Sequence, residues 1–367
     1  MTDPSGKTKP VYQIAVLAGD GIGVEVVDAT LPLLERLQAL HGFSLQLDSH
    51  PAGALHYRDT GQSLPEASFA AAQAADAILL GAMGWPEIRY PDGTEIGPQL
   101  ELRVRLDLYA GVRPARAIPG VPSVLSDARA GQIDLVLVRE STEGLFASRE
   151  TGTVENDSIA RDTMVITREG SRRVHEFAFR LAERRRARGR SANSVTCVDK
   201  ANVFRSMAFF RKVFDEVAST HPDVEARRHY VDATALDLMR KPWSFDVMVT
   251  ENMFGDILSD QAAALMGGMG MAPSGDIGDD HGLFQPCHGS APDIAGQGKA
   301  NPTACFLSAA MMLDWLAERH GDQRLADAAA RLEAAVDAAY ADGGLRPFEL
   351  GGADGTLAIR DAVLARL

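Results

Sequence analysis

The sequence has few cysteines and few aromatic residues for its length. Its 367 residues include three cysteines, Cys197, Cys287 and Cys305, which are widely spaced and form no CxxC pair. Such a number and spacing indicate neither a disulfide framework nor a zinc site, and ordinary buried thiols are the simpler interpretation. Aromatic residues make up only 6% of the chain, with 34 glycines, which is typical of helices packed closely on sheets.

Net positive charge and long apolar runs are also missing. The formal net charge is −13, which repels nucleic acid and anionic membrane surfaces. There is no run of about 18 or more apolar residues, and the first ten residues are polar without an apolar signal region. We therefore expect a soluble cytoplasmic protein that binds neither nucleic acid nor membranes. A local cluster of arginines can still bind a small anion within an acidic protein.

The beginning of the chain alternates between strand and helix patterns. An apolar run at 11–18 ends in Gly-Asp-Gly-Ile-Gly at 19–23, and a helical pattern follows it. Further strands are predicted at 43–47 and 77–80, with a helix at 65–75 between them. The glycine turn lacks the G-x-G-x-x-G spacing of a Rossmann fingerprint, and no acidic residue confirms it about 20 positions on. The alternation predicts an α/β protein, and the length suggests two domains.

Two aspartates share one side of a predicted helix near the middle of the chain. The segment 249–270 indicates the end of a buried strand, a short turn with Asn252 as the N-cap, and then an amphipathic helix. Asp256 and Asp260 are four residues apart, so they project about 40° apart around the axis. Two like charges so placed repel each other. Either a cation lies between them, or they belong to a solvated acidic face.

Three arginines are predicted at the ends of apolar segments. Arg103 and Arg113 flank a strand-like core at 106–112, and Arg139 ends an apolar run at 133–138. The carboxyl ends of strands are where α/β sheets place ligand contacts, and a guanidinium group binds a carboxylate through two parallel hydrogen bonds. A single arginine of this kind is more often a surface salt bridge. Three of them favour an anion site.

Two further charged residues follow predicted strands. Lys200 comes after a strand at 195–198, where it is a base, a ligand clamp or a surface residue, and Asp232 ends a strand at 224–231. A polar loop is predicted at 276–281. The polar segment 149–167, with its alternating small hydrophobic residues, predicts an exposed β-hairpin or arm.

Six blocks of sequence together resemble a known family. They are GDGIG, LR followed by DLYAGVRP, RESTEGLF, VDKANVF, VTENMFGDILSD and HGSAPDIAGQGKANP. In this order they are similar to the β-decarboxylating dehydrogenases, which include isocitrate, isopropylmalate, homoisocitrate, tartrate and D-malate dehydrogenases. The blocks cover nearly the whole chain, and six in order are a specific signal where one alone is weak.

The resemblance implies a two-lobed isopropylmalate dehydrogenase-like α/β fold with a large mixed sheet shared by the lobes, and not a Rossmann fold. Residues 1–108 plus 267–367 would form the first, cofactor-binding lobe. Residues 109–266 would form the second lobe, which builds a homodimer, with the arm at 149–167 in the dimer contact.

The resemblance also assigns roles to residues of this sequence. A malate-like 2-hydroxy diacid would be held by Arg103, Arg113 and Arg139. Mg²⁺ or Mn²⁺ would bind Asp256 and Asp260 together with Asp232 of the partner subunit, and a set of carboxylates without Cys or His suits these ions. Lys200, also from the partner subunit, would be the general base on the 2-hydroxyl, directly or through water. The cofactor NAD would contact His288, Gly289, Ser290, Ala291, Asp293, Ile294, Asn301 and Asn202.

The implied reaction is oxidation of a 2-hydroxy diacid at C2, followed by loss of the β-carboxylate. Asp293 and Ile294 stand where NADP-dependent relatives carry a basic residue. A carboxylate accepts hydrogen bonds from the adenosine ribose hydroxyls and repels a 2′-phosphate. We therefore expect a strong preference for NAD⁺ over NADP⁺.

Three positions depart from the family pattern. Phe146 replaces the tyrosine that protonates the enolate after CO₂ is lost, and phenylalanine has no proton to give. In the substrate-selecting segment, Gln99 stands where isopropylmalate enzymes have leucine, and Gly97 lacks the hydroxyl that isocitrate enzymes use. These departures favour a D-malate-type substrate, including malate or tartrate, with 3-isopropylmalate and isocitrate or homoisocitrate as alternatives.

A different class of protein also belongs to this family. Some members are non-catalytic regulatory subunits of heteromeric isocitrate dehydrogenases, and these tend to lose metal or base residues. Here Lys200, Asp232, Asp256 and Asp260 are all present. Their retention favours an enzyme over a regulatory subunit.

Overall fold

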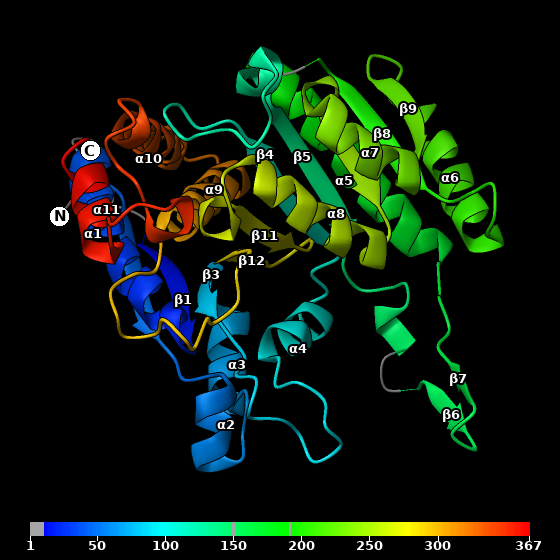
Figure 1. The fold of residues 1–367 in the computed structure, drawn as a ribbon, viewed down its shortest axis with the longest axis horizontal. Helices are drawn as coiled ribbons and strands as arrows, with labels where there is room; N and C mark the ends of the chain where they lie inside the picture. The colour runs from blue at the N-terminus through cyan, green and yellow to red at the C-terminus, as the bar shows by residue number, and fades with distance from the viewer. Residues whose placement is uncertain (1–10, 149–150, 191) are drawn as a thin grey trace. The chain divides into compact units, whose positions relative to one another are not determined.

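The computed structural model describes residues 11–148, 151–190 and 192–367. The chain divides into two compact units (Figure 1). Unit 1 contains residues up to Leu106, the short segment Ile118–Pro122 and the C-terminal part Gly267–Leu367, whereas unit 2 contains Asp107–Ala117 and Ser123–Met266. In the described part of the chain, ten strands form one mixed sheet, five from each unit. The predicted α/β class with a large mixed sheet is confirmed.

In unit 1 the strand order is β2-β1-β3-β12-β11, and all neighbours are parallel except β11 and β12. The strands are β1 (Val11–Gly19), β2 (Ser44–Ser49), β3 (Ala77–Ala82), β11 (Pro273–Ile277) and β12 (Gly282–Pro286). The helices are α1 (Ile22–His41), α2 (Ala54–Thr60), α3 (Glu66–Ala74), α4 (Pro98–Arg105), α9 (Thr303–His320), α10 (Gln323–Tyr340) and α11 (Thr356–Leu364).

Helix α9 is the central helix of unit 1. It packs on β11 and β12 as well as on α1 and α10, and most of its residues are buried, including Phe306, Leu313 and Leu316. The helix is therefore part of the core of unit 1. It ends at Gly321, whose left-handed backbone (φ 65°) caps the last turn.

In unit 2 the strand order is β4-β5-β10-β8-β9, with β4 antiparallel to β5 and the other neighbours parallel. The strands are β4 (Ala110–Arg116), β5 (Asp134–Glu140), β8 (Ser194–Asp199), β9 (Glu225–Tyr230) and β10 (Val247–Thr250). The helices are α5 (Arg168–Ala187), α6 (Arg205–Ala218), α7 (Val231–Arg240) and α8 (Asn252–Leu265). Because parallel strands end at the same edge, the residues after β8 and β10 lie on one side of this half-sheet.

The predicted arm contains an antiparallel hairpin of β6 (Thr153–Glu155) and β7 (Ile159–Arg161). The hairpin extends away from the remainder of unit 2, and all six strand residues are exposed (Figure 1). Two residues of the predicted arm, 149 and 150, lie outside the described part of the chain. A two-stranded hairpin is barely stable alone, which is consistent with a role in binding another chain.

Two predicted elements are only partly correct. In the strand-like core predicted at 106–112, residues 110–112 begin β4, but residues 106–109 form a tight turn after α4, which ends at Arg105, and Asp107 has a left-handed backbone (φ 50°). In the polar loop predicted at 276–281, residues 278–281 do connect β11 and β12, but residues 276 and 277 belong to β11, where Asp276 is fully buried. No described helix is long and apolar enough to cross a membrane.

The core of unit 2 contains a histidine that should make folding sensitive to pH. His175 on α5 is fully buried against Phe210 and Phe214, and burial lowers its pKa to about 3. The unfolded chain binds this proton near pH 6.5, so between pH 6.5 and about 3 the unfolded state binds more protons. The free energy of unfolding should therefore fall by about 1.4 kcal/mol per pH unit below pH 6 on account of this residue.

Urea unfolding at pH 7 and pH 5 checks this expectation. His175→Leu should flatten the pH dependence, whatever it does to stability at pH 7. His56→Gln, which replaces a half-buried histidine of unit 1, is the matched control. An unchanged slope in His175→Leu would contradict the expectation.

Candidate active site

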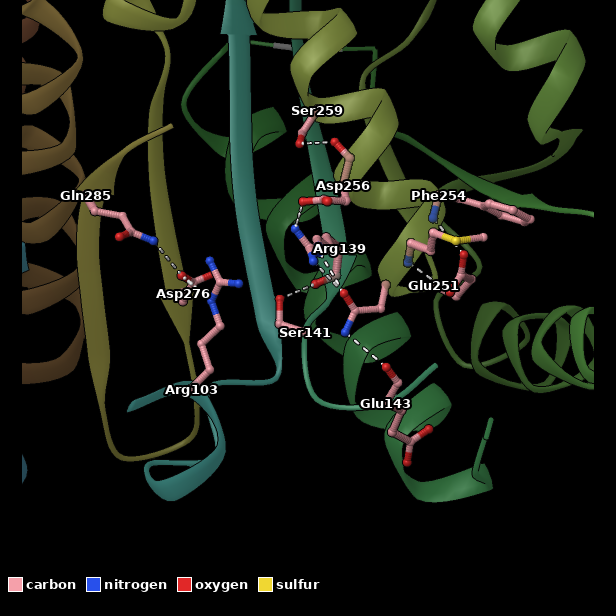
Figure 2. A network of polar contacts seen from close by, with 12 residues as sticks. Arg103, Arg139, Ser141, Glu143, Glu251, Phe254, Asp256, Ser259, Asp276 and Gln285 are labelled. Carbon is pink, nitrogen blue, oxygen red and sulfur yellow. Dashed lines mark hydrogen bonds and ion pairs between the residues drawn. The ribbon is translucent and has the colours of Figure 1, made fainter. Parts of the chain in front are cut away.

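Helix α8 carries the two predicted metal ligands. It follows β10, as the sequence predicted, but its N-cap is Glu251 and not Asn252. The Glu251 carboxylate accepts hydrogen bonds from the backbone N–H groups of Met253 and Phe254 at 3.0 and 2.7 Å (Figure 2). Glu251 is fully buried, and this burial raises its pKa. The cap frees the Asn252 side chain for another contact.

That contact is with Arg139 at the end of β5. The Nε and Nη2 groups of Arg139 both donate to Oδ1 of Asn252, at 2.9 and 2.6 Å, and Nη1 forms an ion pair with Asp256 (Figure 2). Helix α8 approaches β5 closely because residue 255 is glycine. A Cβ at Gly255 would lie only 2.7 Å from Cβ of Arg139.

Arg113 lies on the same face of the half-sheet as Arg139. In the antiparallel pair of β4 and β5, Gly111 is opposite Arg139 and Arg113 is opposite Leu137. Residues opposite each other share a face, and so do residues two apart on a strand. Both arginines are buried, and α8 packs against both strands. The prediction that strand residues bring these two guanidinium groups together is consistent with this register, although Arg113 lies within β4 and not at its end.

Asp260 shows why a cation suits this position. Its pKa is raised, first by burial and then by the negative charge of Asp256, while the charges of Arg113 and Arg139 act in the opposite direction. Two like charges on one side of a helix repel each other, and a divalent cation bound between them removes this repulsion. The donor set contains carboxylate oxygens only, which suits Mg²⁺ or Mn²⁺. The residues present therefore fit the implied metal.

Lys200 and Asp232 form the second charged pair of unit 2. Lys200 follows β8, and Asp232 lies in the first turn of α7, immediately after β9. The Lys200 Nζ donates to Oδ1 of Asp232 at 2.6 Å, and this ion pair lowers the pKa of Asp232. Asn202 is exposed in the turn after Lys200. Within the described residues, no three His, Cys, Asp or Glu side chains come together to hold a metal, so the three-aspartate ligand set remains a prediction.

Phe146 begins a short 3₁₀ segment, Phe146–Ser148, after the RESTEG loop. Its ring lies beside Arg139, with the guanidinium carbon 5.0 Å from the ring centroid. The side chain that replaces the family's tyrosine therefore lies next to a residue that is expected to bind substrate. The ring contact orients Arg139 but supplies no proton.

The other predicted substrate residues lie in unit 1. Arg103 is on α4, not at a strand end, and its Nε donates to Asp276 at 2.9 Å (Figure 2). Asp276 also accepts from the side-chain amide of Gln285 at 3.2 Å. Gln99 is half-buried in the first turn of α4, and its Oε1 has no hydrogen-bond partner among the described residues.

The predicted cofactor segment of unit 1 is fixed at both ends. Ser290 Oγ donates to the Gly84 carbonyl at 2.5 Å, and the Ser290 carbonyl accepts from the N–H of Ile22 at 2.8 Å, in the GDGIG turn. Gly296 N–H donates to Glu25 on α1. Gly289, just before Ser290, and Asp293, between the two points, are exposed, while Ala291 and Ile294 are half-buried. Backbone groups of this segment and the Asp293 carboxylate are thus accessible to a ligand.

His288 and Asn301 flank this segment. His288 is half-buried, its Nδ1 contacts the Gly289 carbonyl at 2.9 Å, and burial lowers its pKa. Asn301 donates to Glu349 at 2.5 Å and accepts from the N–H of Thr303 at 3.1 Å. The nitrogen and the oxygen of the Asn301 side-chain amide are therefore both hydrogen-bonded to neighbouring residues.

Sequence reasoning missed several residues that support the site. Glu251, Asp276 and Glu349 each hold another site residue or its helix, and none was singled out for this role. Asn252 was noticed only as a helix cap. The TEN triplet at 250–252, where α8 begins, offered a signal. An N-cap requires one polar side chain, and the two successive polar residues Glu251 and Asn252 therefore indicate that one of them has another role.

The chain is similar to known proteins over nearly its whole length. The family model for isocitrate/isopropylmalate dehydrogenase matches residues 13–363. The chain is 42% identical over 358 residues to the 3-isopropylmalate/3-methylmalate dehydrogenase of Methanocaldococcus jannaschii, covering 97% of this chain and 99% of that protein. It is 43% identical over 340 residues to the 3-isopropylmalate dehydrogenase of Salinibacter ruber, covering 90% and 88%.

Solved structures show the same fold. The isocitrate dehydrogenase of Methylococcus capsulatus superposes with a TM-score of 0.84 at 36% identity, covering 97% of this chain and 99% of that one. The apo β-decarboxylating dehydrogenase of Thermococcus kodakarensis gives a TM-score of 0.77 at 36% identity, covering 97% and 96%. The chain belongs to the isocitrate/isopropylmalate dehydrogenase family. It is thus an NAD-dependent, divalent-metal-dependent dehydrogenase of the β-decarboxylating type, and the predicted isopropylmalate dehydrogenase-like fold is confirmed.

Proposed function

We propose that the protein oxidises a D-malate-type 2-hydroxy diacid and that decarboxylation follows. The observation that carries this proposal is the charge arrangement of unit 2. Buried Arg113 and Arg139 lie on one face of β4 and β5, and Asp256 and Asp260 face them from α8. Two guanidinium groups beside two carboxylates suit a dianionic substrate bound together with a divalent cation.

Each residue has a defined task in this mechanism. Arg139 binds a substrate carboxylate and stays oriented by Asn252 and Phe146. Lys200 of the partner subunit accepts the proton of the 2-hydroxyl as hydride leaves C2. A bound nicotinamide would supply the hydride acceptor, and a divalent cation, which Asp256, Asp260 and Asp232 of the partner subunit would hold, would supply positive charge that polarises the substrate.

The choice of substrate rests on Gln99. Its Oε1 is shielded from solvent and lacks a hydrogen-bond partner in the described residues. A buried acceptor in this state is costly unless a ligand donates to it. A hydroxyl at C3, which tartrate carries, provides such a donor, whereas an isopropyl group leaves the amide unpaired. Tartrate is therefore favoured over branched apolar substrates, and D-malate, with only hydrogen at C3, leaves space for a water molecule that donates to Gln99 instead.

3-Isopropylmalate is the second candidate. The observation that favours it is the comparison above, since the relatives from Methanocaldococcus jannaschii and Salinibacter ruber are both named for this activity. The two candidates differ only in the group on C3. Gln99 is thus the residue that separates them.

A steady-state assay with Mn²⁺ and NAD⁺ tests the proposal. D-malate, tartrate, 3-isopropylmalate and isocitrate are compared by kcat/KM, and malate or tartrate should be the best substrate. Gln99→Leu should shift the preference towards 3-isopropylmalate by about tenfold, the size expected for one pocket contact. A wild-type preference for 3-isopropylmalate would establish the second candidate. Absence of turnover with every diacid would favour a regulatory subunit.

We also infer a homodimer that shares its active sites. Leu236 and Met239 on α7 and Ile257 on α8 are exposed apolar side chains of neighbouring helices, and Gln261 of α8 donates to the Ala235 carbonyl of α7. An apolar surface of this kind suits a second copy of the chain. Light scattering after size exclusion should give twice the 39.3 kDa chain mass.

Restoring the family's tyrosine at position 146 should restore proton donation to the enolate. On a substrate that is decarboxylated, Phe146→Tyr should accelerate proton delivery to the enolate by about tenfold, a conservative figure for a general acid. Single-turnover measurement of CO₂ release and of the protonated product, relative to NADH formation, checks this. Phe146→Leu removes the ring without adding a donor and should give no gain. Identical product profiles for the two variants would contradict the expected role.

Cofactor preference should depend on the charge of Asp293. This residue is exposed, and its carbonyl accepts from Gln297 at 2.7 Å, so its backbone is held while its carboxylate faces solvent. Wild-type enzyme should prefer NAD⁺ in kcat/KM, and Asp293→Asn should reduce that preference by about tenfold because repulsion of the 2′-phosphate is lost. Asp293→Glu keeps the charge and is the control. Equal wild-type efficiency with both cofactors would refute the expectation.

A further inference from the structure

One buried arginine of unit 2 uses most of its hydrogen-bonding capacity on helix α8. The Arg139 side chain is 4% exposed, while the Asp256 side chain with which it pairs is 51% exposed. Three guanidinium nitrogens point to this helix, two towards Asn252 and one towards Asp256 (Figure 2). The pair therefore joins a buried cation to a carboxylate that solvent can still reach.

Asn252 fixes the position of this guanidinium group. It is buried, its Oδ1 accepts both Nε and Nη2 of Arg139, and its Nδ2 donates to the Glu143 carbonyl at 3.0 Å. The aliphatic part of Arg139 is held as well, since Gly255 lets α8 approach its Cβ and Cγ. The remaining Nη1 is thereby directed at Asp256. The position of the guanidinium group therefore follows from the packing, while its partner, the Asp256 carboxylate, is half exposed.

This arrangement places two cations in competition. A divalent ion bound between Asp256 and Asp260 must share the Asp256 carboxylate with Arg139, and two positive groups at one carboxylate repel each other strongly at such distances. A substrate carboxylate that binds Arg139 offers the guanidinium another anion. Binding of this carboxylate to Arg139 reduces the repulsion between the guanidinium group and a metal ion at Asp256.

We propose that Arg139 acts as an internal competitor of the divalent cation at Asp256, and that a diacid relieves this competition, so diacid and cation bind cooperatively. The proposal rests on the proposed function, in which Arg139 binds substrate and Asp256 binds metal. In the absence of substrate, Arg139 neutralises Asp256 and keeps metal affinity low. When a carboxylate engages Arg139, Asp256 becomes available. Because linkage is reciprocal, metal binding must also strengthen diacid binding by the same factor.

Calorimetric titration of the purified full-length protein with Mn²⁺ alone tests the competition. Arg139→Gln should bind Mn²⁺ roughly five- to tenfold more tightly than wild type, the size of a partly buried ion pair. Arg173→Gln is the matched control. It also removes an arginine of unit 2 from an ion pair, with Asp107, and should leave the Mn²⁺ affinity unchanged. The gain should persist in 0.5 M KCl (roughly three times physiological ionic strength), because salt screens distant charges more than contact pairs.

Succinate provides a second measurement, whose first part uses wild-type protein alone. It is a diacid without a 2-hydroxyl, so it engages arginine without presenting the reacting group. At saturation it should tighten Mn²⁺ binding to wild-type protein by about threefold or more, and this gain should disappear in Arg139→Gln. Unchanged Mn²⁺ affinity in folded Arg139→Gln, or no effect of succinate on wild type, would overturn the competition.

Asp256→Asn separates this inference from the proposed function. If Asp256→Asn binds Mn²⁺ as wild type does, the metal site itself is wrong and the competition is overturned with it. If Asp256→Asn loses Mn²⁺ while Arg139→Gln gains nothing, the metal site stands and only the competition is overturned. Loss in the first variant together with gain in the second supports both.

Discussion

Replacing Lys200 with alanine should lower kcat by about 10²–10⁴-fold, the contribution expected of a positioned general base. Lys200 lies at the end of β8 and pairs with Asp232 at 2.6 Å, so its ammonium group is held at the edge of the half-sheet. Steady-state kinetics with the best diacid measures the loss. Mn²⁺ binding should not weaken, since the substitution removes a positive charge from beside a predicted metal ligand.

Chemical rescue distinguishes a base from a structural residue. Ethylamine added to Lys200→Ala should restore part of the activity in proportion to its unprotonated fraction, so rescue should increase with pH. Lys212→Ala changes an exposed lysine on α6 of the same unit and should behave as wild type. A small loss in Lys200→Ala, or a large loss that no amine rescues, would argue against the role of base.

Asp260→Asn should weaken Mn²⁺ binding by at least about 100-fold and abolish turnover at ordinary metal concentrations, since one of few oxygen ligands loses its charge. The raised pKa of Asp260 reflects burial and the Asp256 charge, a cost that bound metal offsets in the wild type. The variant lacks this repulsion, so its folded state should be as stable as wild type without metal, or more so. Mn²⁺ titration and thermal unfolding in the presence of a chelator measure the two effects.

Asp223→Asn is the control for Asp260→Asn. Asp223 is an exposed acidic residue of the same unit, before β9, and its substitution changes the net charge equally. Full activity of Asp260→Asn at micromolar Mn²⁺ would exclude this residue from the metal site. Destabilisation in chelator would show that Asp260 has a structural role instead.

The sequence predicted the residues that follow strands more accurately than those on helices. Lys200 and Arg139 lie at or directly after the ends of buried strands, which apolar runs bounded by polar residues identify well, whereas Asp232 follows β9, a charged and partly exposed strand. Arg103 was predicted beside a strand because the alternating charged and apolar residues of LRVRLDL match the two-residue period of a strand. In the fold, the first four residues of this segment form the end of α4, where Leu102 and Arg103 are buried.

Local sequence patterns did not predict the contacts between residues that are far apart in the chain. The buried carboxylate of Asp276 is accommodated by Arg103, which is 173 residues away, and Glu349 reaches Asn301 across 48 residues. A polar, glycine-containing segment such as 276–281 has the composition of a loop. Only tertiary partners make its aspartate tolerable inside a strand.

The close approach of α8 to β5 at Gly255 bears on how natural variants of this protein should be interpreted. Any side chain there would press on Arg139 and push the helix outward, carrying both aspartates with it. A homologue with alanine or serine at this position would keep every charged residue of the site and still lose their spacing. Inspection of catalytic residues alone would classify such a homologue as active, so position 255 belongs among those used to assign function within the family.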